Sequence, residues 1–309
     1  MRVWLPYSSI PEAHSRLGDL PANLDVDVLA NDRMPATGAE EVVLLALPNY
    51  TAVQMWHQAE ALSMPNLRWL QLASAGFEHV LDLVPPHIAI CNAAGVHDTG
   101  TAELALGLAL AHLRRIDKAA VDRLTHSFAP VYTDSLADKR VLIVGYGRIG
   151  QAIERRLAGF EVASVTRVAR TARTDPAVHA VTDLPDLVGQ ADVIFLSLPG
   201  SDSTRHIVDA ALLARMADGT LVVNVGRGGL IDTAALLAEH GRIHAALDVT
   251  EPEPLPPDHP LWTAPSITWT PHLGGFTRAY EPRYDALLRA QLLKLAQGQP
   301  LLNVVRSPQ

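Results

Sequence analysis

The sequence predicts an α/β protein with two domains, each built on a mostly parallel sheet. Short apolar runs alternate with helix-like stretches along the whole chain, which is the pattern of β-α-β units. These runs are apolar throughout, as is typical of parallel strands that helices cover on both faces. The chain has 309 residues, of which 48% are hydrophobic, so it is long and apolar enough to bury two cores.

The predicted strands are short apolar runs bounded by polar or turn residues. In the first part of the chain they cover 2–5, 26–30, 42–47, 68–73 and 88–91. In the second part they cover 140–145, 161–166, 192–198, 220–225, 243–249 and 266–270. A predicted helix over 99–117 follows the small-residue segment NAAGVHDTG and would link the domains. A second helix, over 285–298, ends at Gly298, a residue type that commonly terminates helices.

Composition and charge exclude several classes of protein. The net charge of -8 argues against nucleic acid or an acidic membrane surface as the main partner. Cys91 is the only cysteine, so no intramolecular disulfide can form, which suits a reducing cytosol. The N-terminus lacks the apolar core of a signal peptide, and the longest apolar helix candidate is too short to span a bilayer. We therefore expect a cytoplasmic protein that binds neither nucleic acid nor membrane.

The segment VLIVGYGRIG, residues 141–150, combines an apolar strand with the glycine pattern of a dinucleotide-binding loop. Gly145 permits a tight turn, Gly147 lets the backbone approach a pyrophosphate, and Gly150 lets helix and strand pack closely. The stretch from Ile149 onward is helix-like, and its first turn would offer free N–H groups to phosphate. We expect this loop to bind a dinucleotide.

The residues that end the next strand indicate which dinucleotide binds. NAD sites usually carry an acidic residue there, about 20 residues beyond the loop, to bind the ribose. This chain has no acid between Glu161 and Asp175. The predicted strand ends at Thr166, which is followed by Arg167 and, close behind, Arg170. Since an arginine can pair with a 2′-phosphate, we expect NADP(H) rather than NAD(H), unless these arginines form only a solvated loop face.

Three later segments place charged residues beyond the ends of predicted parallel strands. NVGRGGLID puts Arg227 after one strand, and LDVTEPEPLP puts Glu251 and Glu253 after the next. TPHLGG puts His272 after the last strand. Open α/β sheets hold their ligands at this edge, so we expect the charged residues to form a site with the dinucleotide loop. No group of His, Cys and acidic residues has metal-ligand spacing, and no metal is expected.

Together with SAGFEHV, NAAGVHDTGTAE and LSLPGSDST, these segments make the chain resemble the D-isomer-specific 2-hydroxyacid dehydrogenases over nearly its whole length. The resemblance implies two Rossmann-like domains, with a doubly wound, parallel-sheet NAD(P)-binding domain inserted into a flavodoxin-like substrate domain. The inserted domain would cover 98–275, and the substrate domain 1–97 plus 276–309. The resemblance also implies a homodimer, usually built on the nucleotide-binding domain.

The resemblance and the chemistry together assign roles to the charged residues. Arg227 would bind the carboxylate and carbonyl of a 2-oxo acid through its fork of donors. His272 would protonate the carbonyl oxygen during reduction and accept that proton in the reverse reaction. Two acids compete to orient His272 through its other imidazole nitrogen. The family's E-P-L-P pattern favours Glu253 for this role, and Glu251 is then expected to be solvated.

The resemblance further implies which residues line the bound molecules. Backbone N–H groups around Ala75 and Gly76 would bind the substrate carboxylate. Asp248 would hold the nicotinamide amide, unless it only caps a helix or loop. The other residues implied to line the coenzyme are Gly145, Tyr146, Gly147, Arg148, Ile149, Gly150, Thr166, Arg167, Arg170, Ser197, Leu198, Pro199, Thr204, Asn224, Val225 and Gly226.

Several functions fit this resemblance. The segment EPEPLP and the arginines after the second strand are similar to the glyoxylate/hydroxypyruvate reductase branch, which reduces small 2-oxo acids. A phosphoglycerate dehydrogenase is the first alternative, although the chain length of 309 residues weighs against a form with a regulatory domain. A second alternative is a non-enzymatic, nucleotide-sensing corepressor of the same fold, since such relatives keep the Arg, Glu and His. Side chains near LALPNY, residues 45–50, are expected to influence substrate choice.

Overall fold

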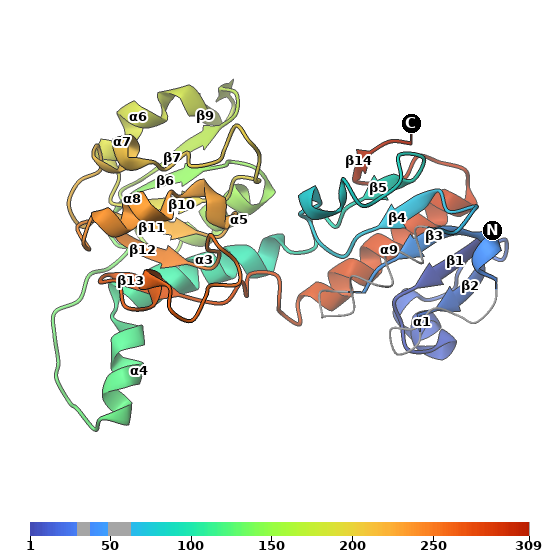
Figure 1. The fold of residues 1–309 in the computed structure, drawn as a ribbon, viewed down its shortest axis with the longest axis horizontal. Coiled ribbons are helices and arrows are strands. Elements are labelled where there is room, and N and C mark those ends of the chain that lie inside the picture. The colour runs from blue at the N-terminus through green and yellow to red at the C-terminus, as the bar shows by residue number, and fades with distance from the viewer. Residues whose placement is uncertain (30–37, 49–62, 309) are drawn as a thin grey trace. The chain divides into compact units, whose positions relative to one another are not determined.

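The computed structural model describes residues 1–29, 38–48 and 63–308, and Figure 1 traces their fold. The chain forms two compact units, Met1–His97 with Arg278–Gln309, and Asp98–Thr277. The sequence analysis expects the inserted domain to cover 98–275, and the second compact unit covers 98–277. Part of the segment 45–50, namely Asn49 and Tyr50, lies outside the described residues.

The first unit is built on a six-stranded sheet with the order β14-β5-β4-β3-β1-β2. Its first five strands are parallel, and β14 pairs antiparallel with β5 at one edge. The order of those five strands, 2-1-3-4-5, is that of flavodoxin-like sheets, which confirms the predicted fold of this unit. The strands are β1 Arg2–Leu5, β2 Asp25–Val28, β3 Val42–Ala46, β4 Trp69–Gln71, β5 Ala89–Cys91 and β14 Val304–Arg306.

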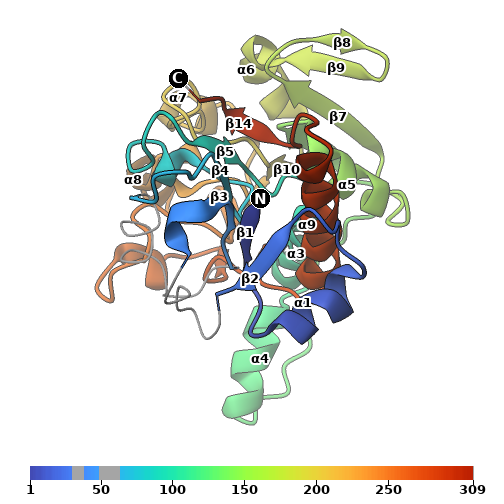
Figure 2. The same cartoon turned by 90° about the vertical axis from the view of Figure 1, so that its right-hand side faces the viewer.

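Two helices of the first unit share one core with the sheet (Figure 2). Helix α1 (Ile10–Leu17) begins where the Ser9 side chain accepts a hydrogen bond from the Glu12 N–H, and it ends at Gly18 with φ 71°. Helix α9 (Tyr280–Ala296) buries Leu288, Leu292 and Leu295, which the helical repeat places on one face. Short 3-10 turns cover Ala39–Glu41 and Glu78–Val80.

The second unit is built on an eight-stranded sheet with the order β13-β12-β11-β10-β6-β7-β9-β8. The strands are parallel except for the antiparallel pair β8–β9. The order reverses between β6 and β10, and ligands of doubly wound sheets bind at such a point. The strands are β6 Arg140–Val144, β7 Ser164–Ala169, β8 Arg173–Thr174, β9 Ala177–Ala180, β10 Val193–Leu196, β11 Leu221–Asn224, β12 His244–Leu247 and β13 Ile267–Trp269.

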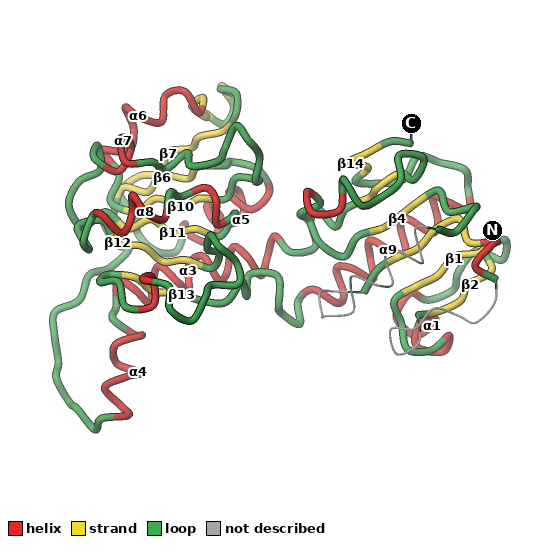
Figure 3. Tube along the Cα trace, viewed as in Figure 1, coloured by secondary structure: helices red, strands yellow, loops and turns green. Residues whose placement is uncertain are grey.

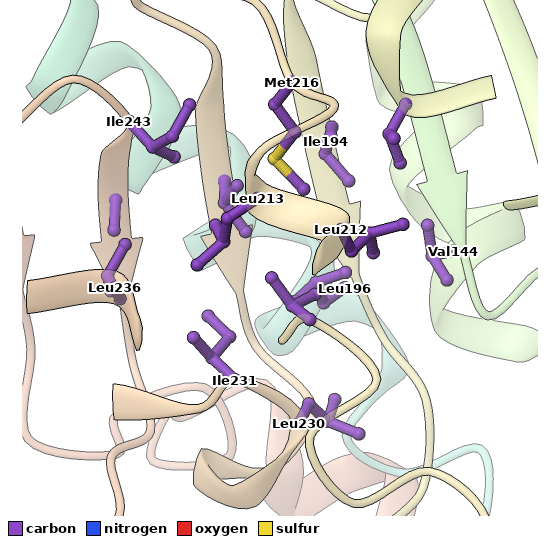
Figure 4. Packing of buried hydrophobic residues seen from close by; sticks show 14 of the residues in the cluster. Val144, Ile194, Leu196, Leu212, Leu213, Met216, Leu230, Ile231, Leu236 and Ile243 are labelled. Carbon is purple, nitrogen blue, oxygen red and sulfur yellow. The ribbon is translucent and has the colours of Figure 1, made fainter. Parts of the chain in front are cut away.

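Helices cover both faces of this sheet, as Figure 3 shows by colour. Side chains of one strand alternate between two cores: Val141 and Ile143 pack on the face covered by α3 and α5, whereas Leu142 and Val144 pack on the other. The second core also contains Leu212 of α7 (Figure 4). The helices are α3 Asp98–Leu113, α4 Ile116–Leu124, α5 Arg148–Leu157, α6 Leu184–Leu187, α7 Ala210–Leu213 and α8 Thr233–Ala238, with 3-10 turns at Val181–Asp183, Val188–Gln190, Gly228–Leu230 and Pro260–Trp262.

The predicted helices are present, with shifted ends. The helix predicted over 99–117 divides into α3 and α4 because Arg115 adopts a left-handed φ of 54°, which interrupts helical hydrogen bonding. The helix predicted over 285–298 begins earlier, at Tyr280. Within the described ranges, none of the helices has both the length and the apolar character needed to cross a membrane.

One predicted strand is displaced, and the displacement affects the site. The strand predicted over 161–166 is β7, Ser164–Ala169, which lies three residues later. Glu161 adopts a left-handed φ of 55° in the turn before it, so the chain cannot extend from that point. Thr166 pairs with Leu142 in the middle of the sheet and does not end the strand. The prediction that Thr166 marks the strand end is therefore wrong.

Candidate active site

The glycine loop joins β6 to α5 as the sequence predicts, and two of its three glycines have a steric reason to lack a side chain. Gly145 has φ 102°, and a Cβ there would lie 2.7 Å from the Ser197 carbonyl carbon. A Cβ on Gly150 would lie 2.6 Å from the Gly145 oxygen, so only glycine allows α5 to pack this close. A Cβ on Gly147 would meet nothing within 4 Å, which leaves space over the loop for a phosphate.

The end of β7 lies beside this loop. The Val168 carbonyl accepts hydrogen bonds from the Gly145 and Tyr146 N–H groups, both at 2.9 Å. Arg170 directly follows β7 and is exposed. Within the described part of the chain, Arg170 makes no ion pair. The residue that directly follows β7 beside the loop is therefore Arg170, which the sequence prediction names together with Thr166 and Arg167.

Arg167 lies inside β7, and its charge is already paired. Its guanidinium forms a salt bridge with Glu154 of α5, in which Nε donates at 2.9 Å. The Tyr146 hydroxyl also hydrogen-bonds to Glu154, and both Arg167 and Arg173 lie over the Tyr146 ring. The buried Tyr146 side chain thus packs in a polar cluster, and only its backbone belongs to the loop. The sequence prediction misses Glu154 and Arg173 because they meet Tyr146 only in the folded sheet.

Arg227 lies beyond the end of β11, in a loop that its neighbours hold closely. The side chain of the fully buried Asn224 donates to the Arg227 carbonyl at 2.9 Å and accepts from the Gly226 N–H at 3.0 Å. A Cβ on Gly226 would lie 2.7 Å from the Leu198 oxygen, and one on Gly228 would lie 1.9 Å from the Thr250 oxygen. These close approaches explain why glycines flank Arg227, and they fix the backbone that carries its guanidinium.

His272 and Glu253 form a hydrogen-bonded pair. The His272 Nδ1 and Glu253 Oε1 atoms are 2.5 Å apart, and both side chains are partly exposed. Glu253 follows β12 and His272 follows β13, and these neighbouring strands are parallel, so their ends meet at one edge. The bond to Nδ1 leaves Nε2 as the nitrogen that can exchange a proton with a ligand.

The pair changes the pKa of both partners. The hydrogen bond to Glu253 raises the pKa of His272 above its usual value, against the opposing effect of burial. Burial alone would raise the pKa of Glu253, but the hydrogen bond and charge of His272 hold it below its usual value. Nearby Arg227 adds to the lowering at Glu253 and opposes the raising at His272. The imidazole is therefore more easily kept protonated near neutral pH than a free histidine.

Asp248 shapes the loop that carries His272. Its buried carboxylate accepts hydrogen bonds from the Thr270 hydroxyl at 2.7 Å, the Leu273 N–H at 2.6 Å and the Gly274 N–H at 2.9 Å. The His272 N–H donates to the Asp248 carbonyl at 2.8 Å. His272 has a left-handed φ of 54°, which is costly for a non-glycine residue and which these bonds maintain. A contact between Asp248 and the nicotinamide amide stays a prediction.

Glu251 is expected to be solvated; about one-third of its side chain is exposed, and its carboxylate is also held by two partners. Its carboxylate accepts from Arg205 Nη1 at 2.5 Å and lies 3.1 Å from His206 Nε2. The Arg205 contact lowers the pKa of Glu251 below its usual value. Arg205 and His206 follow Thr204 in the loop after β10. The sequence prediction does not include either residue, although both directly follow the segment LSLPGSDST, which is expected to line the coenzyme.

The remaining predicted residues lie in loops of the two units or in the first turn of α5. In the first unit, Ala75 and Gly76 follow β4; the side chain of Asn92 donates to the Ala75 oxygen and that of Ser74 to the Gly76 oxygen, each at 2.6 Å. To the residues that the structure describes, the Ala75 and Gly76 N–H groups donate no hydrogen bond. In the second unit, Arg148 and Ile149 begin α5, and the loops after β10 and β11 contain Ser197, Leu198, Pro199, Thr204 and Val225.

Comparisons with known proteins identify the family of the chain. Residues 106–274 match the model of the D-isomer specific 2-hydroxyacid dehydrogenase, NAD binding domain. The chain is 33% identical over 257 residues to glyoxylate/hydroxypyruvate reductase B of Citrobacter koseri, covering 78% of this chain and 79% of that protein. A D-isomer specific 2-hydroxyacid dehydrogenase of Xanthobacter autotrophicus, crystallised with NADPH and MES, superposes with a TM-score of 0.76 at 26% identity over 99% of this chain and 98% of that one.

These matches define a two-domain protein with an NAD-binding module. The chain belongs to the D-isomer-specific 2-hydroxyacid dehydrogenase family, as its motifs predict. It is also 33% identical over 234 residues to D-3-phosphoglycerate dehydrogenase of Methanocaldococcus jannaschii, covering 72% of this chain and 44% of that protein. The chain thus spans about half the length of the phosphoglycerate dehydrogenases that it matches.

Proposed function

We propose that this protein is an NAD(P)-dependent oxidoreductase that reduces small 2-oxo acids, such as glyoxylate or hydroxypyruvate, to 2-hydroxy acids. The observation that carries the proposal is the His272–Glu253 pair, 2.5 Å apart, at the same sheet edge as Arg227 and in the same unit as the glycine loop. A proton donor, a carboxylate-binding guanidinium and a dinucleotide loop are the groups that this reaction needs. The likeness to the Citrobacter koseri reductase supports the substrate class.

The chain's own residues would supply binding and the proton. The Arg227 guanidinium would bind the substrate carboxylate and the C2 carbonyl oxygen through parallel N–H donors. Protonated His272 would donate from Nε2 to the carbonyl oxygen, and Glu253 would stabilise the imidazolium before transfer. NADPH, when bound at the glycine loop, supplies the hydride that adds to the carbonyl carbon. Backbone N–H groups of Ala75 and Gly76 stay candidates for the carboxylate.

A panel of 2-oxo acids tests this proposal. NADPH and NADH oxidation would be followed at the usual nicotinamide absorbance with glyoxylate, hydroxypyruvate, pyruvate, phenylpyruvate and phosphohydroxypyruvate. We expect turnover of glyoxylate or hydroxypyruvate with NADPH. Selective turnover of phosphohydroxypyruvate would instead assign a phosphoglycerate dehydrogenase, which the likeness to the Methanocaldococcus jannaschii protein favours as the second candidate. Nucleotide binding without turnover of any acid would contradict an enzymatic role and support the sensor.

The preference for NADP(H) is proposed from Arg170. This exposed residue directly follows β7, whose Val168 carbonyl holds the glycine loop, so its guanidinium can reach a group on the adenosine ribose. No acid occupies the segment from Ser164 to Thr174. The Xanthobacter autotrophicus relative was crystallised with NADPH, which supports the same preference.

Replacing Arg170 with alanine is expected to weaken NADPH binding about 10-fold to 100-fold, as for a lost hydrogen bond between charged groups, with little change for NADH. Arg167→Ala is the matched control, because its guanidinium is already paired with Glu154. Arg167→Ala should change the affinities for NADPH and NADH by the same factor, and it should also lower thermal stability. Titrations that follow coenzyme fluorescence measure the dissociation constants of NADPH and NADH for each variant. Equal losses of NADPH and NADH in Arg170→Ala would mean that Arg170 does not read the 2′-phosphate.

We also propose that the protein is a homodimer that pairs through α4 and the segment after it. In both views this region extends away from the sheet of its own unit (Figures 1 and 2). Its large apolar side chains are exposed: Ile116, Val121, Leu124, Phe128, Val131 and Tyr132. A monomer seldom exposes so many apolar side chains in one segment, and a second copy of the chain would cover them.

Leu124→Asp is expected to convert the dimer to a monomer, since a carboxylate buried in an apolar interface costs several kcal/mol. Leu83→Asp, at an exposed leucine of the first unit, is the matched control and should stay dimeric. Sedimentation velocity over a range of protein concentrations measures both. A wild-type protein that is monomeric at all concentrations would refute the dimer, and a Leu124→Asp dimer would refute this interface.

A further inference from the structure

Glu251 connects two loops and the start of a helix in the second unit. Its two carboxylate oxygens contact Arg205 at 2.5 Å and His206 at 3.1 Å, both in the loop after β10. Its backbone oxygen accepts from the Thr233 hydroxyl at 3.1 Å, at the start of α8. Glu251 itself belongs to the loop after β12. The side chain is about one-third exposed, so water competes with these contacts only partly.

Glu251, Arg205 and His206 also contact the loop that carries Arg227. The His206 N–H donates to the Gly229 carbonyl at 2.7 Å. A Cβ on Gly229 would lie 3.2 Å from Glu251 Oε1 and 3.3 Å from Arg205 Nη1, so the ion pair packs directly on this glycine. Gly229 is two residues after Arg227. The ion pair therefore packs against the backbone that follows Arg227 in the same loop.

Glu251 is also two residues before Glu253, the partner of His272. The intervening Pro252 accepts from the Thr250 hydroxyl at 2.9 Å, so the loop between the two acids has little freedom. The contacts of the Glu251 side chain with the loop after β10 thus help to set the position of the backbone that carries Glu253. The groups with proposed roles in proton transfer and in substrate binding both lie within a few residues of this anchor.

We propose that Glu251, held by Arg205 and His206, is a positioning residue that sets the placement of Arg227 relative to the Glu253–His272 pair. This inference rests on the proposed function for its effect on turnover. A partly exposed ion pair contributes little to the free energy of unfolding. The inference gives this pair a role in the geometry of the site instead. Misplacement of reacting groups by about 1 Å can reduce a rate about 100-fold.

The test replaces Glu251 with glutamine, which keeps the side-chain size and removes the charge. We expect kcat/KM for the 2-oxo acid to fall about 10-fold to 100-fold, with NADPH affinity unchanged. Arg205→Gln should give a similar loss, and the double variant no further loss, because both changes release the same anchor. Glu239→Gln is the matched control: its carboxylate is 2.6 Å from Arg242, before the N-terminal end of β12 and away from the site.

A second readout does not depend on turnover. The protonation of His272 is followed by NMR of histidine-labelled protein. The signal of His272 is identified as the one that is missing from the spectrum of a His272 variant. We expect the pKa of His272 to fall in Glu251→Gln, because a displaced Glu253 stabilises the imidazolium less, and to stay unchanged in Glu239→Gln. An unchanged His272 titration, or a kcat/KM loss no larger than that of Glu239→Gln, overturns the inference. If wild-type protein reduces no acid, the proposed function fails, and the titration alone decides the positioning role.

Discussion

Replacing His272 with asparagine is expected to reduce turnover of 2-oxo acids by about 100-fold to 10,000-fold, the range typical for loss of a general acid. Asparagine suits the test because it tolerates the left-handed φ of 54° that His272 adopts. The loop should keep its shape, since Asp248 holds it through backbone groups and the Thr270 hydroxyl. Steady-state rates measure the effect on turnover, and coenzyme titrations measure the effect on NADPH affinity. NADPH affinity should change little.

Turnover retained in His272→Asn would refute the acid–base role. A matched variant, Glu253→Gln, tests the pair from its other side. Reduction needs protonated His272, so the rate is full below the pKa of His272 and falls as the pH rises through it. Glu253 raises that pKa, so Glu253→Gln should move this fall to lower pH. Oxidation of the hydroxy acid should show the opposite limb, because it needs the neutral imidazole. An unshifted profile would mean that Glu253 does not tune His272.

Replacing Arg227 with glutamine is expected to lower kcat/KM at least about 100-fold, because hydrogen bonds to charged groups contribute about 1.5–3 kcal/mol each and two would be lost. Arg227→Lys should lose less, since it keeps the charge but not the planar fork of donors. The loop itself should persist, because Asn224 and the flanking glycines hold it through backbone atoms. Saturation curves for glyoxylate with each variant measure the loss.

Arg215→Gln is the control for removal of an exposed arginine, because Arg215 pairs only with exposed Asp186 and the Pro185 carbonyl among the described residues. It should leave kcat/KM unchanged. A loss in Arg227→Gln confined to NADPH affinity would place Arg227 in coenzyme binding and contradict its role with the substrate. Equal activity of the lysine variant and the wild type would show that charge alone suffices.

The elements that the sequence predicts well are those whose cause is local. Apolar runs such as 141–144 and 193–196 become central strands because each buries side chains on both faces. The glycine loop is equally local, since the turn at Gly145, the open space at Gly147 and the close packing at Gly150 all lie within six residues of the chain. In contrast, the sequence analysis does not predict β14, which pairs Val304 with Cys91 across the sheet, a pairing that only the complete fold creates.

By itself, the sequence determined the α/β class, the dinucleotide loop and the charged residues that follow β11, β12 and β13. These features depend on residue type and spacing along a few neighbouring positions. The E-P-L-P pattern favours Glu253 as the partner of His272, and the structure pairs these two residues, but only the tertiary structure decided that Glu251 binds the loop after β10. It also decided that Arg170 rather than Arg167 follows β7, because a turn residue with positive φ displaces the strand by three positions. Such choices depend on which loops meet in space, and side-chain partners far apart in the chain leave no local pattern.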